Sequence, residues 1–288
     1  MLNALTIDVE DYYQVSAFEA DIPRDHWEHY ESRVVANTRR ILRLLEARQI
    51  SATFYILGWV AERFPQLVRD IHEAGHEIGS HSYWHRLIYQ LSPKEFRQDL
   101  IRSRDVLEQI IGQPVKTFRA PSFSVTKQSL WAIEILIEEG FTSDSSIFPI
   151  HHDRYGIPDA PRHLHRLDAS GGALWEFPPT SARLAGMNLP VSGGGYFRLY
   201  PLSLTVHALR TINCHSRRPF MFYVHPWEFD PEQPRLSAGA WLSRRRHYLN
   251  LRSTERKFCG LLSAFSFGRL CDCIAAAAPH QPAAGSLV

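Results

Sequence analysis

His81 and His85 lie four positions apart, directly after a short strand-like segment, Glu77–Ser80. On a helical turn, positions i and i+4 lie on the same face, so both imidazoles could reach one metal ion. Neutral imidazole is the commonest protein ligand for zinc and its neighbours among the transition metals. A catalytic metal also needs a carboxylate and an open position for water. The acidic cluster Asp8–Asp11, which ends the first apolar segment, could supply that carboxylate.

Each of these two signals has an ordinary structural interpretation. Two histidines at this spacing also occur as polar residues of an exposed turn, and acidic residues after a strand often cap the next helix. Their combination favours a metal hydrolase, which needs both a carboxylate ligand and a separate general base. Zinc is the expected ion from the ligand types, although cobalt, manganese, nickel or iron would suit the same set.

Strand-like and helical segments alternate along the chain, which predicts a parallel sheet with helical crossovers. Five polar residues fall at or just past the ends of expected strands: Asp8, His81, Arg119, Asp144 and His225. In a barrel of parallel strands, those carboxyl ends form the catalytic face. We expect strands at 4–9, 52–57, 77–80, 115–119, 141–144 and 220–226, and helices at 33–48, 59–74, 93–111, 128–140 and 257–278.

The order of five motifs resembles that of the polysaccharide deacetylases of carbohydrate esterase family 4. The motifs are Thr6–Glu10, His81–His85, Arg119–Phe123, Asp144–Ser146 and Val224–Pro226. Two longer segments, Asp8–Tyr13 and Tyr223–Phe229, more narrowly resemble the branch associated with bacterial exopolysaccharide export systems. The resemblance implies an α/β fold: a distorted (β/α) barrel of about seven parallel strands, with the active site at the C-terminal strand ends.

The resemblance also implies a divalent metal held by two histidines and one acid, and it assigns His81 and His85 as ligands. The first motif departs from the family pattern, in which two aspartates are adjacent and the second is a ligand, because a valine follows Asp8 here. Strand residues i and i+2 share a face, so Glu10 is expected as the third ligand. Asp11 is the alternative, and its other possible role is a helix cap.

The remaining motif residues receive catalytic roles from the same resemblance. Asp8 corresponds to the general base that takes a proton from the attacking water, and Arg119 to the residue that orients it. His225 corresponds to the general acid that protonates the departing sugar amine. A backbone amide near Ser122 is expected to help hold the oxyanion, and Asp144 is expected to orient or charge-tune His225 or Arg119.

Trp227 and Tyr196 are candidate cleft residues because sugar rings stack on aromatic faces, and core packing is the alternative for both.

The expected function is metal-dependent removal of N-acetyl groups from N-acetylhexosamine units of a bacterial polysaccharide or its oligosaccharide precursor. A first alternative is hydrolysis of other non-peptide C–N bonds, such as those of cyclic amides or ureides, on the same fold. A second alternative is a non-catalytic glycan-binding module.

The length of 288 residues suits one barrel domain, expected over residues 1–278, with a flexible tail at 279–288. The segment 150–200 is rich in His, Pro and Gly, and we expect it to be a loop or β insertion that shapes the cleft. Lys plus Arg is 32 and Asp plus Glu is 30, so the net charge of +2 argues against nucleic acid as a partner. The basic run Ser243–His247 is a local exception, and it fits a solvated face or a contact to a substrate phosphate.

No signal-peptide pattern and no run of roughly 18 apolar residues is visible, so we expect no transmembrane segment. The four cysteines, at positions 214, 259, 271 and 273, show no CxxC spacing and fit reduced structural thiols. Together these features lead us to expect a cytoplasmic protein that acts on an N-acetylated glycan. The sequence does not indicate an oligomeric state.

Overall fold

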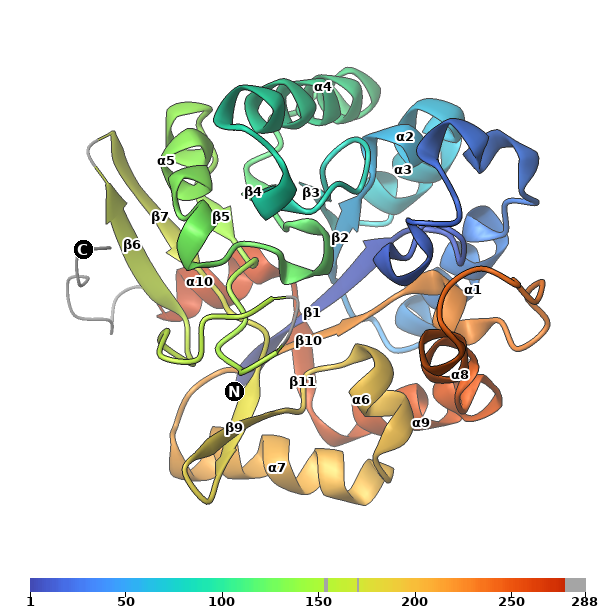
Figure 1. The fold of residues 1–288 in the computed structure, drawn as a ribbon. Coiled ribbons are helices and arrows are strands. Elements are labelled where there is room, and N and C mark those ends of the chain that lie inside the picture. Colours follow the sequence, from blue (N-terminus) through green and yellow to red (C-terminus); the bar gives the residue numbers. More distant parts are fainter. Residues whose placement is uncertain (153–154, 170, 278–288) are drawn as a thin grey trace.

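The computed structural model describes residues 1–152, 155–169 and 171–277, and the tail expected at 279–288 lies outside them. Figure 1 shows strands at the centre of the molecule with helices placed around them. The sheet order is β10-β1-β2-β3-β4-β5-β7-β6, and every neighbouring pair except β7–β6 is parallel. The expected fold of a mostly parallel sheet with helices is therefore confirmed. The strands of this path are β1 Leu2–Val9, β2 Thr53–Ile56, β3 Glu77–Ser80, β4 Thr117–Phe118, β5 Ser143–Asp144, β6 His165–Ala169, β7 Gly172–Glu176 and β10 Met221–Val224.

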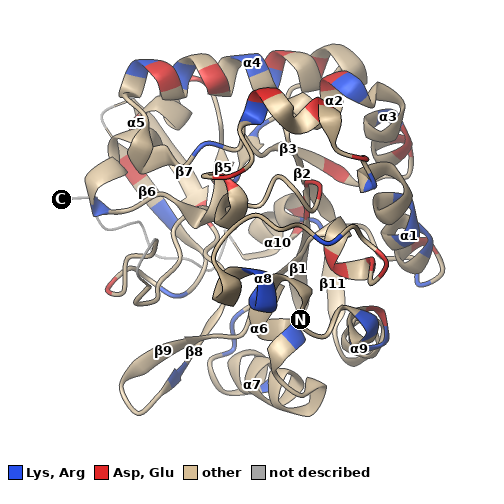
Figure 2. Ribbon diagram, turned by 45° about the vertical axis from the view of Figure 1, so that its right-hand side comes forward, with Lys and Arg blue, Asp and Glu red and all other residues tan. Residues whose placement is uncertain are grey.

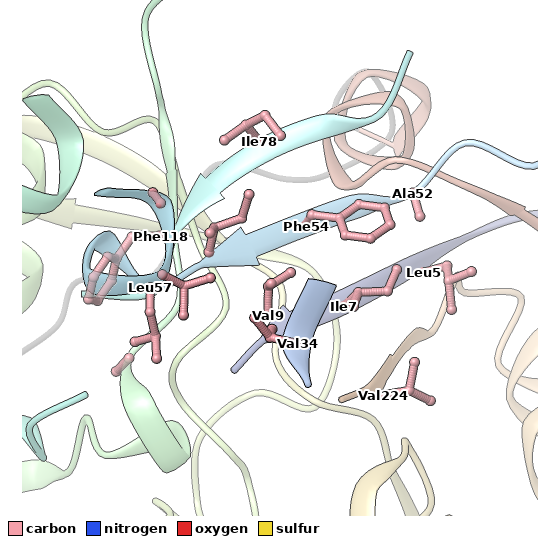
Figure 3. Packing of buried hydrophobic residues seen from close by; sticks show 14 of the residues in the cluster. Leu5, Ile7, Val9, Val34, Ala52, Phe54, Leu57, Ile78, Phe118 and Val224 are labelled. Atoms are coloured by element: carbon pink, nitrogen blue, oxygen red, sulfur yellow. The ribbon is translucent and has the colours of Figure 1, made fainter. Parts of the chain in front are cut away.

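The two faces of β1 carry different kinds of residue, because successive side chains of a strand point to opposite sides of the sheet. Leu5, Ile7 and Val9 are fully buried, and Figure 3 shows them in one hydrophobic cluster with residues of the neighbouring strands and of α1 (Val34–Glu46). Thr6 and Asp8 face the opposite side of the sheet, where both contact Arg119. The apolar half of the strand thus anchors it to the helices, while the polar half reaches the interior.

Ten α-helices occur in the described part of the chain, and none of them combines the length and apolarity needed to cross a bilayer. The expected helix 93–111 is found with those bounds: the Ser92 hydroxyl accepts from the Glu95 amide, and the Glu95 carboxylate accepts from the Ser92 amide. The helices are α1, α2 Gly58–Arg63, α3 Pro65–Glu73, α4 Pro93–Ile111, α5 Trp131–Glu138, α6 Gly194–Leu199, α7 Leu202–His215, α8 Trp241–Tyr248, α9 Leu251–Ala264 and α10 Leu270–Ala277.

Two expected helices are divided in the structure. The segment 59–74 forms α2 and α3 because Phe64, which precedes Pro65, adopts a non-helical conformation (φ −127°, ψ 57°). The segment 257–278 contains the end of α9, then β11 (Ser266–Gly268), then α10. Strand β11 pairs in parallel with the first residues of β1, and the ladder hydrogen bonds it gains there interrupt the helical pattern.

The segment 150–200 contributes more to the sheet than the sequence indicated. Its strand β7 is a parallel neighbour of β5, and β6 pairs with β7 as a hairpin. A second hairpin, β8 (Ser181–Leu184) and β9 (Met187–Pro190), precedes α6. Among the described residues, no strand pair joins β7 to β10, so the barrel is open there.

Irregular chain from the same segment occupies the space beside β10. The Thr180 hydroxyl accepts from the Met221 amide at 2.8 Å, and the Ser192 carbonyl accepts from the Tyr223 amide at 2.7 Å. Gly193 forms a bridge with Tyr223 at φ 144°, and a Cβ at this position would lie 1.9 Å from the Tyr223 carbonyl oxygen. Only glycine permits so close an approach of the two backbones.

Candidate active site

Glu10, His81 and His85 form a buried cluster at the carboxyl ends of β1 and β3. Their candidate ligand atoms all lie within 4.8 Å of one another. The Nδ1 atom of His81 donates to the Arg119 carbonyl oxygen at 2.8 Å, which leaves Nε2 as the ligand atom of this ring. Two imidazoles and one carboxylate are the donor set of many catalytic zinc sites. The structure therefore brings together the three residues that the sequence suggested as ligands.

One oxygen of Glu10 supports this interpretation. Oε1 accepts a hydrogen bond from Trp227 Nε1 at 3.1 Å. Oε2 is buried and lies 2.8 Å from His85 Nε2, but it accepts no hydrogen bond of acceptable geometry from the described residues. Burying a carboxylate oxygen without a partner is unfavourable. A cation held between Glu10 and the two imidazoles would remove that cost, so the residues fit a divalent metal.

The protonation states suit metal binding as well. Burial lowers the pKa of His81 to about 4, so this imidazole is neutral at pH 7. Burial by itself would raise the pKa of Glu10, but His85, and after it His225 and His81, together outweigh burial and hold the pKa of this carboxyl well below its usual range. Metal ligands must be deprotonated, and both groups are in that form at neutral pH.

The two histidines converge through a loop, and the helical spacing inferred from the sequence is wrong. Residues 81–87 contain no helix. Ser82 and His85 have positive φ values of 65° and 52°, an unusual conformation for residues with a side chain. These two left-handed residues bend the chain so that the rings of His81 and His85 lie edge to face, with centroids 5.3 Å apart.

Two charged side chains from other elements hold this loop in place. The Asp99 carboxylate on α4 accepts from the Tyr83 amide at 2.7 Å and from the Trp84 amide at 3.1 Å. Arg24 donates to the Trp84 carbonyl at 2.6 Å and to the His85 carbonyl at 3.3 Å. Charge-assisted bonds to the backbone are stronger than neutral ones, so they can fix an unfavourable backbone conformation.

Asp8 lies beside the cluster and pairs with a fully buried arginine. Arg119 Nη1 donates to Asp8 Oδ1 at 2.6 Å and to the Thr6 hydroxyl at 2.7 Å. The other guanidinium nitrogens donate to the carbonyl and hydroxyl of Ser145 at 3.2 and 2.9 Å, and Tyr55 presents its ring 4.3 Å from the guanidinium carbon. Because its nitrogens are all bonded, Arg119 is fixed in place and holds Oδ1 of Asp8, the residue that the family resemblance assigned it to orient; its role in the reaction stays a prediction.

Asp11 does not belong to the cluster. Its carboxylate accepts hydrogen bonds from the Ser32 hydroxyl at 2.7 Å and from the amides of Arg33 and Val34 at 2.9 and 3.1 Å, at the start of α1. Burial raises its pKa to about 6. The structure thus places Asp11 in the helix-capping role, and it leaves Glu10 as the acid that faces the histidines.

His225 completes the site from the end of β10. Its Nε2 atom lies 3.9 Å from Asp8 Oδ2 and 3.7 Å from Glu10 Oε1, so this edge of the ring faces both acids. Its Nδ1 atom lies 3.1 Å from Glu228 Oε2, and Arg198 Nε donates to Glu228 Oε1 at 2.7 Å. Burial would lower the pKa of His225, but Glu228, Glu10 and Asp8 together raise it to about 9.

The acid that contacts the His225 ring is Glu228, and not Asp144 as suggested from the sequence. Asp144 Oδ1 accepts from the Ser146 hydroxyl at 2.5 Å, and the Asp144 carboxyl interacts with Glu176. Burial raises the pKa of Asp144, against the nearby Arg119 charge, and no contact to His225 is found among the described residues. Asp144 is therefore a neighbour of Arg119 and not of His225, and its suggested link to His225 is corrected.

A local signal could have identified Glu228. Proline after His225 and glutamate three residues after it match the start of a helical turn, and a capped 3-10 helix, Pro226–Phe229, is found there. The Glu228 carboxylate accepts from the His225 amide at 3.0 Å as well as from the ring. Its partner Arg198, on α6, carries no such signal, since it is 30 residues distant in sequence.

The three suggested substrate residues have different environments. Trp227 is only 5% exposed and stacks between His225 and His247, with ring centroids 5.2 and 4.2 Å away, so it positions Glu10 and His225 and offers no open face to a sugar. Tyr196 is half-buried on α6, and its role stays a prediction. Ser122 has a left-handed conformation (φ 52°), and its hydroxyl lies 2.8 Å from that of Ser16.

Two family descriptions match different parts of the chain. Residues 25–136 match the polysaccharide deacetylase family, and residues 145–275 match a family described as a domain of unknown function (DUF3473). A peptidoglycan-N-acetylglucosamine deacetylase of Bacillus cereus is 35% identical over 98 residues, which are 34% of this chain and 36% of that protein. A peptidoglycan deacetylase-like protein of Gibberella zeae is 30% identical over 157 residues, 53% of this chain and 45% of that protein. The chain thus spans less than half the length of these relatives.

Solved structures share the fold over nearly the whole chain. A putative polysaccharide deacetylase from Mycobacterium smegmatis has a TM-score of 0.64 at 19% identity, covering 99% of this chain and 92% of that one. Puue allantoinase has a TM-score of 0.60 at 14% identity, covering 97% of this chain and 90% of that one. The chain is thus similar to the polysaccharide deacetylase family over residues 25–136, and it shares the barrel-like α/β fold of these solved structures.

Proposed function

We propose that this protein is a metal-dependent N-deacetylase that acts on N-acetylhexosamine units of a bacterial polysaccharide or its oligosaccharide precursor. The observation that carries the proposal is the convergence of a buried two-histidine, one-carboxylate cluster with Asp8 and His225. Acid, base and candidate ligands come from the ends of three strands, β1, β3 and β10, that are far apart in sequence. The similarity to deacetylases of peptidoglycan over part of the chain supports the same class of substrate.

The metal would be held by Glu10 Oε2 and the two imidazoles of His81 and His85. When bound, a divalent cation at such a set lowers the pKa of a water molecule and polarises an acetamide carbonyl. Zinc is our preferred ion because nitrogen ligands and a single carboxylate suit it. Trp227, through its bond to Oε1, keeps the second oxygen of Glu10 directed at the histidines.

Asp8 acts as the general base in this proposal. Arg119 holds Oδ1, so Oδ2 is the oxygen that accepts the proton from the attacking water. Because Arg119 is itself fixed by Thr6 and Ser145, the carboxylate cannot rotate away from the reacting atoms. An orientation fixed in advance reduces the entropic part of the barrier.

His225 acts as the general acid. Its Nδ1 edge is held by Glu228, so the proton to be transferred lies on Nε2, which faces the site. A raised pKa keeps this proton in place until the C–N bond breaks, and the sugar amine then leaves in its neutral form. The backbone amides of Phe123 and Ser124 already donate to the carbonyls of Ala120 and Pro121, so the Ser122 amide is our candidate donor to the oxyanion.

Acetate release from defined oligosaccharides tests this proposal. Chitopentaose, an N-acetylmuramic acid-containing peptidoglycan fragment and allantoin would each be incubated with the wild-type protein and with His225→Ala. We expect acetate from at least one glycan, a loss of about 10²–10⁴-fold in His225→Ala, and no turnover of allantoin. Turnover of allantoin alone would favour the cyclic-amide alternative, and glycan binding without acetate would favour the binding module.

A motif-level similarity also leads us to propose an exopolysaccharide as the source of the substrate. The segments Asp8–Tyr13 and Tyr223–Phe229 carry that similarity, and both contribute to the site: Asp8, Glu10, His225, Trp227 and Glu228 come from them. Faster acetate release from an N-acetylated exopolysaccharide oligomer than from the peptidoglycan fragment would support it, and the reverse order would contradict it.

A further inference from the structure

A pocket lies beside α8, outside the candidate active site. It has a volume of about 520 Å³, and its wall is formed by α8, by residues 235–236 and by the turn at 249–250. Three arginines and two aromatic residues line it: Arg235, Arg244, Arg245, Trp241 and Tyr248. No acidic side chain lines the pocket among the residues that the structure describes. Figure 2 shows α8 with Lys and Arg positions in blue and no red position.

The arginines are arranged around the aromatic rings. The Arg235 guanidinium carbon lies 4.2 Å from the Tyr248 ring centroid, and that of Arg245 lies 5.4 Å from the Trp241 ring centroid. Trp241 is 64% exposed, which is unusual for so large an apolar side chain. Arginine binds carboxylate and phosphate through paired hydrogen bonds, and an exposed indole offers a flat face for a sugar ring.

The pocket wall is held by internal contacts. The Tyr248 hydroxyl accepts from the Leu236 amide at 2.7 Å and donates to the Pro234 carbonyl at 3.2 Å. Arg244 donates to the carbonyls of Ser237 and Gly239 at 2.8 and 2.6 Å. Arg244 therefore stabilises the wall through these hydrogen bonds, while Arg235 and Arg245 supply the positive charge that would contact a ligand. A preformed wall reduces the entropy lost on binding.

The same helix reaches back to the candidate active site. His247, next to Tyr248, stacks on Trp227 at 4.2 Å, and Trp227 stacks on His225 at 5.2 Å. His247 and Tyr248 themselves have ring centroids 4.7 Å apart. Three successive ring contacts thus connect the candidate general acid to the pocket. Trp227 and His247 are buried, so these contacts place the pocket close to the candidate acid without themselves meeting a ligand.

We propose that this pocket is a binding subsite for an anionic sugar unit, a carboxylate- or phosphate-bearing residue of the glycan that reaches the active site. Arg235 and Arg245 would bind the anionic group, and Trp241 would stack on the ring. The glycan part of this inference rests on the proposed function. An anionic membrane surface is the other partner for a Trp- and Arg-bearing helix, but α8 has only eight residues and lacks the long apolar face of helices that lie on bilayers.

Equilibrium binding tests the subsite without turnover. All proteins would carry Asp8→Asn, and calorimetry would compare a hyaluronan hexasaccharide, which alternates glucuronate with N-acetylglucosamine, with neutral chitohexaose. N-acetylglucosamine 1-phosphate would test phosphate as the anionic group. We expect the variant Arg235→Gln/Arg245→Gln to bind the preferred anionic ligand about five- to tenfold more weakly, and to bind chitohexaose as before.

The matched control is Arg252→Gln/Arg256→Gln, which removes two exposed charges from the neighbouring helix α9. We expect less than a twofold change in this control. Equal losses in both variants would overturn the proposal in favour of a general charge effect, and failure of both anionic ligands to bind would overturn it outright. Binding to phosphatidylglycerol vesicles that the pocket variant loses, without binding to either soluble ligand, would show that the surface serves a membrane instead.

Failure of the subsite is distinguishable from failure of the proposed function. If the wild-type protein releases acetate but shows no preference for the anionic oligosaccharide, only the subsite is contradicted. If the anionic ligands bind through Arg235 and Arg245 but no glycan releases acetate, only the proposed function is contradicted.

Discussion

Glu228→Gln is the substitution that most sharply probes the candidate acid. Glu228 contacts the His225 ring at 3.1 Å, and its charge contributes the largest increase to the pKa of that imidazole, which reaches about 9. Glutamine keeps the size of the side chain and can still accept from His225, but it removes the negative charge. The substitution should therefore lower the pKa of His225.

The size of this shift follows from the contact. A hydrogen bond to a charged group contributes about 1.5–3 kcal/mol, and one pKa unit corresponds to 1.36 kcal/mol, so the loss of the charge should lower the pKa of His225 by about 1 to 2 units. Because His225 must be protonated to act as the acid, activity is lost as the pH rises through this pKa. The alkaline limb of the kcat/KM profile should therefore move to lower pH by about 1 to 2 units. A cation bound in both proteins does not change the direction of this difference.

The assay is acetate release from an N-acetylglucosamine oligomer between pH 6 and pH 11, at substrate concentrations below KM. Glu228 also pairs with the buried Arg198, so the variant should be less stable by about 3–5 kcal/mol. The melting temperature would be measured in parallel, at each pH of the profile. A loss of folded protein that is uniform over the pH range scales the rates but leaves the position of the limb unchanged.

Glu232→Gln is the matched control, because it makes the same change at an exposed glutamate of the same segment. We expect its profile to coincide with that of the wild-type protein. An unchanged alkaline limb in Glu228→Gln, with active and folded protein, would refute the assignment of Glu228 as the residue that sets the charge of His225. A limb that moves to higher pH would refute the electrostatic argument itself.

Three further substitutions test other parts of the structure. Arg24→Gln should weaken metal binding about tenfold, measured by competition with a chelator, because it frees the backbone of the His85 loop; an affinity equal to that of the exposed-site control Arg63→Gln would contradict this role. Ser92→Ala should lower the free energy of unfolding by about 1 kcal/mol in urea without changing acetate release, and unchanged stability would show that the capping box is not significant. Phe54→Ala should lower the free energy of unfolding by about 3–5 kcal/mol because its ring, on β2, is fully buried in the hydrophobic cluster, and a loss below 1 kcal/mol would contradict the packing in Figure 3.

Much of the fold follows from local patterns in the sequence. The apolar alternation of β1 and the capping box at Ser92 each determine an element from nearby residues, and the expected bounds of α4 agree with the structure. The break between α2 and α3 also has a local cause, Pro65, although the pattern of apolar residues concealed it. Strand β11 could not be predicted in this way, because it depends on pairing with β1, more than 250 residues away.

In the candidate site, too, some features follow from nearby residues and others depend on contacts between distant elements. The residue types of Glu10, His81 and His85 suggested a metal cluster, but the loop that joins the histidines has a conformation set by Asp99 and Arg24 from distant elements. The sequence suggested His225 as the general acid, but it suggested Asp144 as the possible partner of His225, where the structure has Glu228. Side-chain contacts between elements determine that choice, and a single sequence does not display them.

The metal content of the purified protein, measured together with its activity, tests the central claim most directly. The protein would be stripped with a chelator and titrated with Zn²⁺ while acetate release from chitopentaose is followed. We predict that the stripped protein is inactive, that about one equivalent restores activity, and that Glu10→Gln binds the ion weakly and stays inactive. Full acetate release by the stripped protein, or a Glu10→Gln variant that retains metal and activity, would contradict the account.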